Sequence, residues 1–273
     1  MSTTEDFSSK NLILFYIITY IFSWAFWVPQ AMHSQGLIPT SPFTDFLASP
    51  FNVAAFGPLV GAIIVTLAFE GKSSTVVLLK RGAKWNFSAK WWIVIFFLLP
   101  IIAIIALSYA SFFGGYTPSF EWLSFPFALV IAFVFIFFLG GPLQEEFGWR
   151  GYALPRLQSK LDSITSSIIV GLFWGLWHLP LFFIPSQVIY YNQPIWGLMI
   201  STILLSILFT WVFNNTKGSV LATLFFHTTF NWSHYAFPVL GSEVGATMYL
   251  ILEFALALMI SVYYFYNRRK NQE

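Results

Sequence analysis

Eight long apolar stretches run through the chain, and each is long enough to cross a lipid bilayer as a helix. About 20 apolar residues at 1.5 Å each span the roughly 30 Å of hydrocarbon in a membrane. The stretches lie at about 12–28, 51–69, 91–109, 123–141, 163–184, 196–213, 219–237 and 245–266. Runs that are apolar throughout, such as 127–140, lack the alternation of a membrane β-barrel. We therefore expect an all-α fold, a polytopic transmembrane bundle of about eight spanning helices.

The composition excludes the other broad classes. Of the 273 residues, 58% are hydrophobic and 9% are charged, whereas about a quarter of the residues of a soluble domain are charged. A water-soluble protein and a nucleic-acid-binding protein are therefore not expected. The chain has no cysteine, which removes disulfides, thiolate metal sites and cysteine nucleophiles. We find no sequence repeat, low-complexity tract or second domain, so we expect a single transmembrane domain over 1–273.

The basic residues predict the orientation in the membrane. With eight spans and a cytoplasmic N-terminus, all 13 Lys and Arg fall in segments on the cytoplasmic side. The charged residues of the opposite loops are the acids Asp45, Glu121 and Glu243. Cytoplasmic loops are enriched in Lys and Arg. We therefore expect a multi-pass integral membrane protein with both termini cytoplasmic, located in the plasma membrane if the source is bacterial. The basic loop 71–90 should be a solvated face at the membrane surface.

Two adjacent carboxylates follow the fourth apolar stretch. Ionisable side chains inside a membrane are costly, so each one is a candidate for function. Glu146 and Arg150 are four residues apart with the acid first, a spacing that lets them pair on one helix face. Glu145 has no cation near it in sequence and is the candidate base. The alternative is an interfacial charge cluster at the end of the span.

Two histidines lie inside later apolar stretches. His178 shares a helix face with Trp174, and its structural alternative is a hydrogen-bonded anchor. His227 and Asn231 also lie one turn apart. Both donate hydrogen bonds, so they can bind a developing oxyanion, or the histidine can bind a metal. A polar clasp between helices is the alternative for this pair.

These three elements, E-E-x-x-x-R, a histidine and H-x-x-x-N, resemble the CPBP family of intramembrane proteases. That family includes the CAAX prenyl endopeptidases and bacterial proteins linked to bacteriocin processing and self-immunity, also called the abortive-infection family. Residues 145–157 resemble the first family motif and 227–231 the third. The second motif, F-x-x-x-H, differs here because Trp174 occupies the aromatic position. The motif-bearing core covers about 135–235, and the flanking spans match only in hydrophobicity.

The resemblance implies an endopeptidase acting on a membrane-embedded or lipidated peptide. It implies that the catalytic residues are Glu145, His178, His227 and Asn231, and that the supporting residues are Glu146, Arg150 and Trp174. Glu145 and His178 would activate water. His227 and Asn231 would stabilise the oxyanion.

The cofactor stays open at this stage. The H-E-x-x-H zinc motif is absent. A zinc ion held by His178, His227 and Glu145 is one alternative. A glutamate mechanism without metal is the other, and we favour it slightly.

Two other functions remain open from the sequence. Buried acids and histidines are also typical of a transporter or proton conduit, although we find no inverted repeat. A non-catalytic membrane scaffold or immunity protein would keep the motifs for packing alone. We expect Glu253, inside the last stretch, to be protonated and hydrogen-bonded to a neighbouring helix, and His234 to be interfacial.

Overall fold

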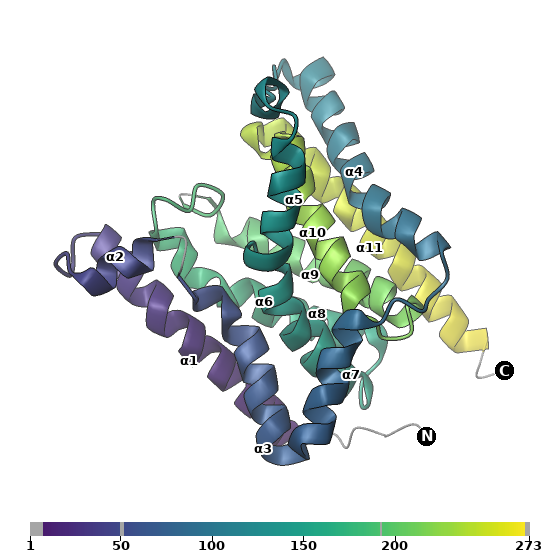
Figure 1. Ribbon diagram of the computed structural model, residues 1–273. Coiled ribbons are helices and arrows are strands. Elements are labelled where there is room, and N and C mark those ends of the chain that lie inside the picture. Colours follow the sequence, from purple (N-terminus) through teal and green to yellow (C-terminus); the bar gives the residue numbers. More distant parts are fainter. Residues whose placement is uncertain (1–7, 50–51, 192, 271–273) are drawn as a thin grey trace. The chain divides into compact units, whose positions relative to one another are not determined.

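The computed structural model describes residues 8–49, 52–191 and 193–270, with side chains as far as Tyr266. The described residues are mostly helical and include no strand (Figure 1), which confirms the all-α fold. The longer helices are α1 (Ser9–Ser34), α3 (Gly57–Lys80), α4 (Lys90–Gly114), α5 (Ala128–Leu139), α8 (Ser163–Trp177), α9 (Ile195–Asn215), α10 (Val220–Ala236) and α11 (Glu243–Lys270). The short elements are α2 (Pro42–Ala48), η1 (Ala54–Phe56), η2 (Arg81–Ala83), η3 (Glu121–Ser124), α6 (Pro142–Glu146), η4 (Phe147–Ala153), α7 (Leu154–Gln158), η5 (Leu179–Phe183) and η6 (Val239–Gly241).

Within the described residues, seven helical segments are long and apolar enough to cross a membrane. They are Ser9–Ser34, Ala54–Ala83, Lys90–Gly114, Ala128–Gln158, Ser163–Phe183, Ile195–Asn215 and Glu243–Tyr266. The protein is thus a multi-pass integral membrane protein. The remaining predicted span, 219–237, is helix α10, which has 17 residues. Its length of about 25 Å is near the lower limit for a crossing.

Two predicted borders differ from the structure. The fourth span does not end at 141, because the chain continues as a helical segment to Gln158 after a break at Gly140 and Gly141. The charges that follow this break suggested a membrane border, but they are paired inside the protein. Helix α3 likewise extends to Lys80 with a kink at Gly71, so half of the predicted loop 71–90 is helical. Phe51, the first residue of the predicted second span, lies outside the described residues.

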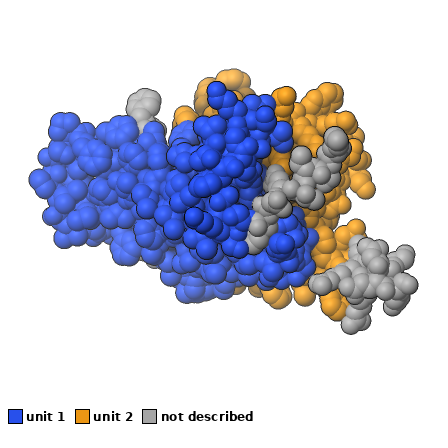
Figure 2. Space-filling view, turned by 90° about the horizontal axis from the view of Figure 1, so that it is seen from below, with its two compact units in different colours: residues 1–79, 144–203 blue, residues 80–143, 204–273 orange. Residues whose placement is uncertain are grey.

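The contacts within the chain divide it into two compact units, coloured separately in Figure 2. Unit 1 comprises residues 1–79 and 144–203, and unit 2 comprises 80–143 and 204–273. The single transmembrane domain over 1–273 stays a prediction.

In unit 1, side chains of α1 fix the carboxyl end of α8. Tyr20 donates its hydroxyl hydrogen to the carbonyl of Phe173 at 2.6 Å, and Trp24 donates its indole N–H to the carbonyl of Trp177 at 3.0 Å. The last four carbonyls of a helix have no backbone partner within it. These donors therefore stabilise the end of α8, where His178 follows as the capping residue.

In unit 2, helix α4 packs against α10 and α11, and α5 packs against α10. Indole groups again bridge the elements: Trp232 of α10 donates to the carbonyl of Leu129 and Trp122 to the carbonyl of Ala236, each at 2.9 Å. Helix α10 begins at a capping serine, since Ser219 accepts the backbone N–H of Ala222 at 3.1 Å. These contacts fix α10, which carries His227 and Asn231.

We predict that α10 crosses the membrane, so that the loop at Lys217 and the carboxyl end of the chain lie on the same, cytoplasmic side. Reporter fusions placed at 217 and after 270 should both report cytoplasm, and fusions near 118 and 190 should report the opposite face. If α10 does not cross, the fusions at 217 and after 270 will report opposite sides. The termini lie outside the described residues, and the fusions measure their location directly.

Candidate active site

The first motif lies on a buried helical segment that begins directly after a backbone break. Gly141 has φ of 113°, a conformation that favours glycine, and Pro142 then starts α6. The π-helix η4 follows, and all seven of its residues are buried. A Cβ atom on Gly148 would lie 2.6 Å from the carbonyl oxygen of Pro58 in α3. Glycine at 148 therefore lets η4 contact the backbone of α3 directly.

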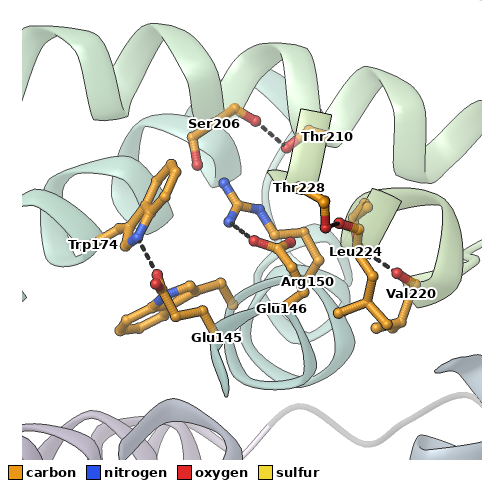
Figure 3. Close-up of polar contacts among 11 residues, drawn as sticks. Glu145, Glu146, Arg150, Trp174, Ser206, Thr210, Val220, Leu224 and Thr228 are labelled. Carbon is orange, nitrogen blue, oxygen red and sulfur yellow. Dashed lines mark hydrogen bonds and ion pairs between the residues drawn. The ribbon is translucent and has the colours of Figure 1, made fainter. Parts of the chain in front are cut away.

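Glu146 and Arg150 form the ion pair that their spacing predicts. The Nη1 atom of Arg150 lies 2.8 Å from Oε1 of Glu146, and both side chains are 0% exposed (Figure 3). Such a pair offsets part of the cost of removing two charges from water. It holds a charged turn inside the bundle immediately after Glu145.

Glu145 is held by two indole groups. Its Oε2 atom accepts a hydrogen bond from Nε1 of Trp174 at 2.6 Å and another from Nε1 of Trp149 at 3.3 Å. Figure 3 shows the Trp174 indole directed at the carboxylate. Both donors are neutral, so these two hydrogen bonds orient the carboxylate without adding a charge.

His178 lies at the end of α8 rather than in the middle of a helix. Pro180 follows two residues later and cannot donate a backbone hydrogen bond, so the chain leaves the α-helix here and continues as η5. The Nδ1 atom lies 2.8 Å from the carbonyl oxygen of Trp174. A carbonyl only accepts, so Nδ1 carries the hydrogen, and in the neutral ring Nε2 has the lone pair. The Nε2 atom of His178 is thus suited to accept a proton or a hydrogen bond.

Trp174 contacts three of the candidate residues. Its indole N–H binds Glu145, its carbonyl accepts from His178, and its ring lies 4.5 Å from the guanidinium carbon of Arg150. The last contact has the geometry of a cation–π interaction. The structure thereby joins the first two motifs through one side chain in unit 1.

The third motif lies on α10 in unit 2. His227 is buried, with its ring edge-on to Phe209 at a centroid distance of 5.5 Å. Asn231 donates from Nδ2 to the carbonyl of Gly140 at 2.8 Å. One amide hydrogen of Asn231 therefore holds the end of α5, and the second is the one suited to an oxyanion. Convergence of this motif with Glu145 and His178 stays a prediction, because the motifs belong to different units.

Glu253 and His234 both belong to unit 2. Glu253 is fully buried in α11, and its protonation and its hydrogen bond to a neighbouring helix stay predictions. His234 is partly buried, and its ring contacts that of Tyr249 at a centroid distance of 4.8 Å. The Nδ1 atom of His234 lies 3.0 Å from the carbonyl oxygen of Phe230.

Neither unit by itself holds a complete metal site among its described residues. Structural and catalytic zinc sites use at least three protein ligands, and no group of three His, Asp or Glu that could share a metal ion occurs within either unit, as far as its residues are described. Oε2 of Glu145 also accepts two indole N–H groups. A zinc ion held by His178, His227 and Glu145 would need ligands from both units and stays a hypothesis.

Two contacts of the motif segment were missed by the sequence analysis. Trp149 lies four residues after Glu145, so its spacing alone placed the two on one helix face. The second contact is an ion pair, in which Oε1 of Glu70 in α3 lies 2.5 Å from Nη2 of Arg156. The two residues are 86 positions apart in the sequence, so no helical spacing could predict this pair. The guanidinium of Arg156 also lies 3.6 Å from the ring centroid of Tyr152. This contact fixes α7 to α3.

The fold and the paired motifs define a class, that of multi-pass helical membrane proteins with an acid and a histidine held together inside the protein. Residues 126–233 match the family model described as type II CAAX prenyl endopeptidase Rce1-like. A CAAX prenyl protease 2 from Methanococcus maripaludis is 27% identical over 232 residues, which cover 81% of this chain and 83% of the relative. These matches confirm the resemblance to the CAAX protease family that the three motifs indicated.

The first prediction at this site separates the base from its support. Arg150→Ala leaves the buried Glu146 carboxylate without its cation, and removing one partner of a buried pair costs on the order of 3–5 kcal/mol. We expect a lower melting temperature together with lost activity. Glu145→Gln keeps the shape and should melt like the wild type while turnover falls about 100-fold or more. Melting in detergent and peptide cleavage measure both. Early melting of Glu145→Gln with a stable, inactive Arg150→Ala would reverse the two roles.

The second prediction concerns the indole N–H of Trp174. Trp174→Phe keeps an aromatic ring beside Arg150 and the backbone carbonyl that binds His178, but it removes the donor to Glu145. A hydrogen bond to a charged group is worth about 1.5–3 kcal/mol, so kcat/KM for peptide cleavage should fall about tenfold or more. Trp122→Phe is the matched control, because it removes an indole bond to the Ala236 carbonyl instead. Equal activity of Trp174→Phe and the control would contradict the role of this donor.

Proposed function

We propose that the protein is an intramembrane endopeptidase that hydrolyses a peptide bond of a membrane-associated or lipidated peptide. The observation that supports this most is the connection through Trp174, which binds the Glu145 carboxylate with its indole and the His178 ring with its carbonyl. Peptide hydrolysis needs a group that takes a proton from water, and this pair supplies a carboxyl group and a ring nitrogen that has a lone pair in the neutral imidazole. The match to the CAAX protease family supports the same activity.

In the proposed reaction, Glu145 and Nε2 of His178 orient a water molecule. The water oxygen bonds to the carbon of the scissile carbonyl while one proton passes to Glu145, and the carbonyl electron pair becomes an oxyanion. The carbon–nitrogen bond then breaks, and the proton held by Glu145 moves to the departing nitrogen. The products are a carboxyl group and an amine, and Glu145 regains its charge.

His227 and the second amide hydrogen of Asn231 would stabilise the oxyanion in this proposal. Donors aimed at a developing charge act strongly where water is excluded, and His227 is buried. Glu146 and Arg150 would hold the first motif in place, since their buried ion pair lies directly after Glu145.

The proposed substrate is a peptide that ends in a prenylated C-a-a-X sequence. The names of the matched family and of the archaeal relative refer to such substrates. A prenylated cysteine partitions into the bilayer, which would bring the adjacent peptide bond to a membrane protein. A leader-bearing peptide or a transmembrane segment is the alternative.

We predict that purified protein in detergent cleaves a farnesylated C-a-a-X peptide and that 1,10-phenanthroline leaves the rate unchanged. The unprenylated peptide is the control for lipid recognition, and Glu145→Gln is the control for chemistry. Loss of activity with chelator and recovery with added zinc would contradict the metal-free mechanism. No cleavage of any lipidated or transmembrane peptide would favour a scaffold, immunity protein or transporter.

A further inference from the structure

Tyr190 lies outside the three motifs, in the loop between η5 and α9 of unit 1. Its backbone is fixed by a turn: the N–H of Tyr190 donates to the carbonyl of Gln187 at 2.8 Å, and the N–H of Gln193 donates to the carbonyl of Tyr190 at 3.0 Å. Phe182 of η5 packs its ring against that of Tyr190, with centroids 5.7 Å apart. The loop therefore presents this side chain in a defined place.

The ring of Tyr190 stacks on the imidazole of His178. The two centroids are 5.5 Å apart with an interplanar angle of 26°. Trp27 of α1 is also nearly parallel to the imidazole, at 6.5 Å and 22°, and Trp177 meets it edge-on at 4.8 Å. Stacked and edge-to-face rings limit rotation about the side-chain bonds of the residue that they enclose. One of the rings that restrain His178 thus comes from a loop.

The phenol of Tyr190 lies within the electrostatic field of Glu145. Burial raises the pKa of Tyr190, and the negative charge of Glu145 raises that pKa further. Both effects disfavour the phenolate, so the side chain stays a neutral phenol at neutral pH. Replacing it by phenylalanine consequently changes no charge near the carboxylate.

We propose that Tyr190 is a positioning residue that holds the imidazole of His178 in the plane required for Nε2 to face the reacting water. This inference rests on the proposed peptidase function. The hydrogen bond from Nδ1 to the carbonyl of Trp174 fixes one edge of the imidazole. The stack with Tyr190 restrains one face of the ring, which limits its rotation about the side-chain bonds. Small displacements of a catalytic group cost large factors in rate, so the loop residue contributes through His178.

The test compares Tyr190→Phe, which keeps the ring, with Tyr190→Leu, which removes it. Tyr191→Leu is the matched control, because Tyr191 is the next residue of the same loop and, within the described residues, has no ring contact with His178. We expect Tyr190→Phe and Tyr191→Leu to keep kcat within about threefold of the wild type. Tyr190→Leu should lose about tenfold or more in kcat with KM little changed. Equal losses in Tyr190→Phe and Tyr190→Leu would assign the effect to the hydroxyl and overturn the proposal.

A second measurement does not depend on cleavage. The ¹⁵N shifts of histidine rings report which nitrogen carries the hydrogen, and the chain has only 4 histidines. The signal of His178 is identified by its absence in His178→Gln. The wild type, Tyr190→Phe and Tyr191→Leu should show the Nδ1–H form, and Tyr190→Leu an averaged pattern. An unchanged pattern in Tyr190→Leu would refute the positioning role even if the wild type cleaves peptides. A changed pattern without any peptide cleavage would leave the positioning intact and refute the peptidase function instead.

Discussion

The structure of the first motif depends on how a helical membrane protein accommodates charge. Transfer of an isolated charge into a low-dielectric interior is prohibitively costly. Glu146 and Arg150, both 0% exposed, neutralise each other within one turn. Arg156 is paired with Glu70 of another helix, and Glu145 is held by indole hydrogen bonds. The motif segment can therefore lie inside the protein, although its charged residues are typical of a membrane border. The position of α6, η4 and α7 follows from this pairing.

Aromatic residues act here as hydrogen-bond donors as much as apolar surface. Indole N–H groups bind a carboxylate in unit 1 and backbone carbonyls in both units. An indole offers a donor with no charge to bury, so it suits a site where water is scarce. Trp174 stands where the family motif has phenylalanine, and a phenylalanine has no donor for Glu145. In this chain the carboxylate is therefore oriented by a group that the usual motif does not supply.

Much of the fold and some of the site could be predicted from the sequence. Whether a feature was predictable depends on how far apart its residues lie along the chain. Spacing along a helix is local, so it predicted the apolar helices and the pairing of Glu146 with Arg150. The same spacing places Trp149 beside Glu145, a contact that was not predicted. Contacts between distant segments carry no such signal. The bond from Asn231 to Gly140 spans 91 positions, and Tyr190 reaches His178 from a loop. The continuation of the fourth span to Gln158 was missed because burial of its charges requires partners such as Glu70 that only the folded chain brings near.

The π-helix η4 gives the motif segment a wider turn than a regular α-helix has. Its backbone hydrogen bonds join residues five apart instead of four, so the segment holds an additional residue. Loss of one residue between Phe147 and Ala153 would let these turns close into an α-helix, and the later side chains would keep nearly the same direction around the axis. Arg156 would then still face Glu70, whereas a deletion inside a regular α-helix would turn it away by about 100°. Among proteins that share this segment, one-residue differences in its length should therefore be tolerated better than they would be in an ordinary helix.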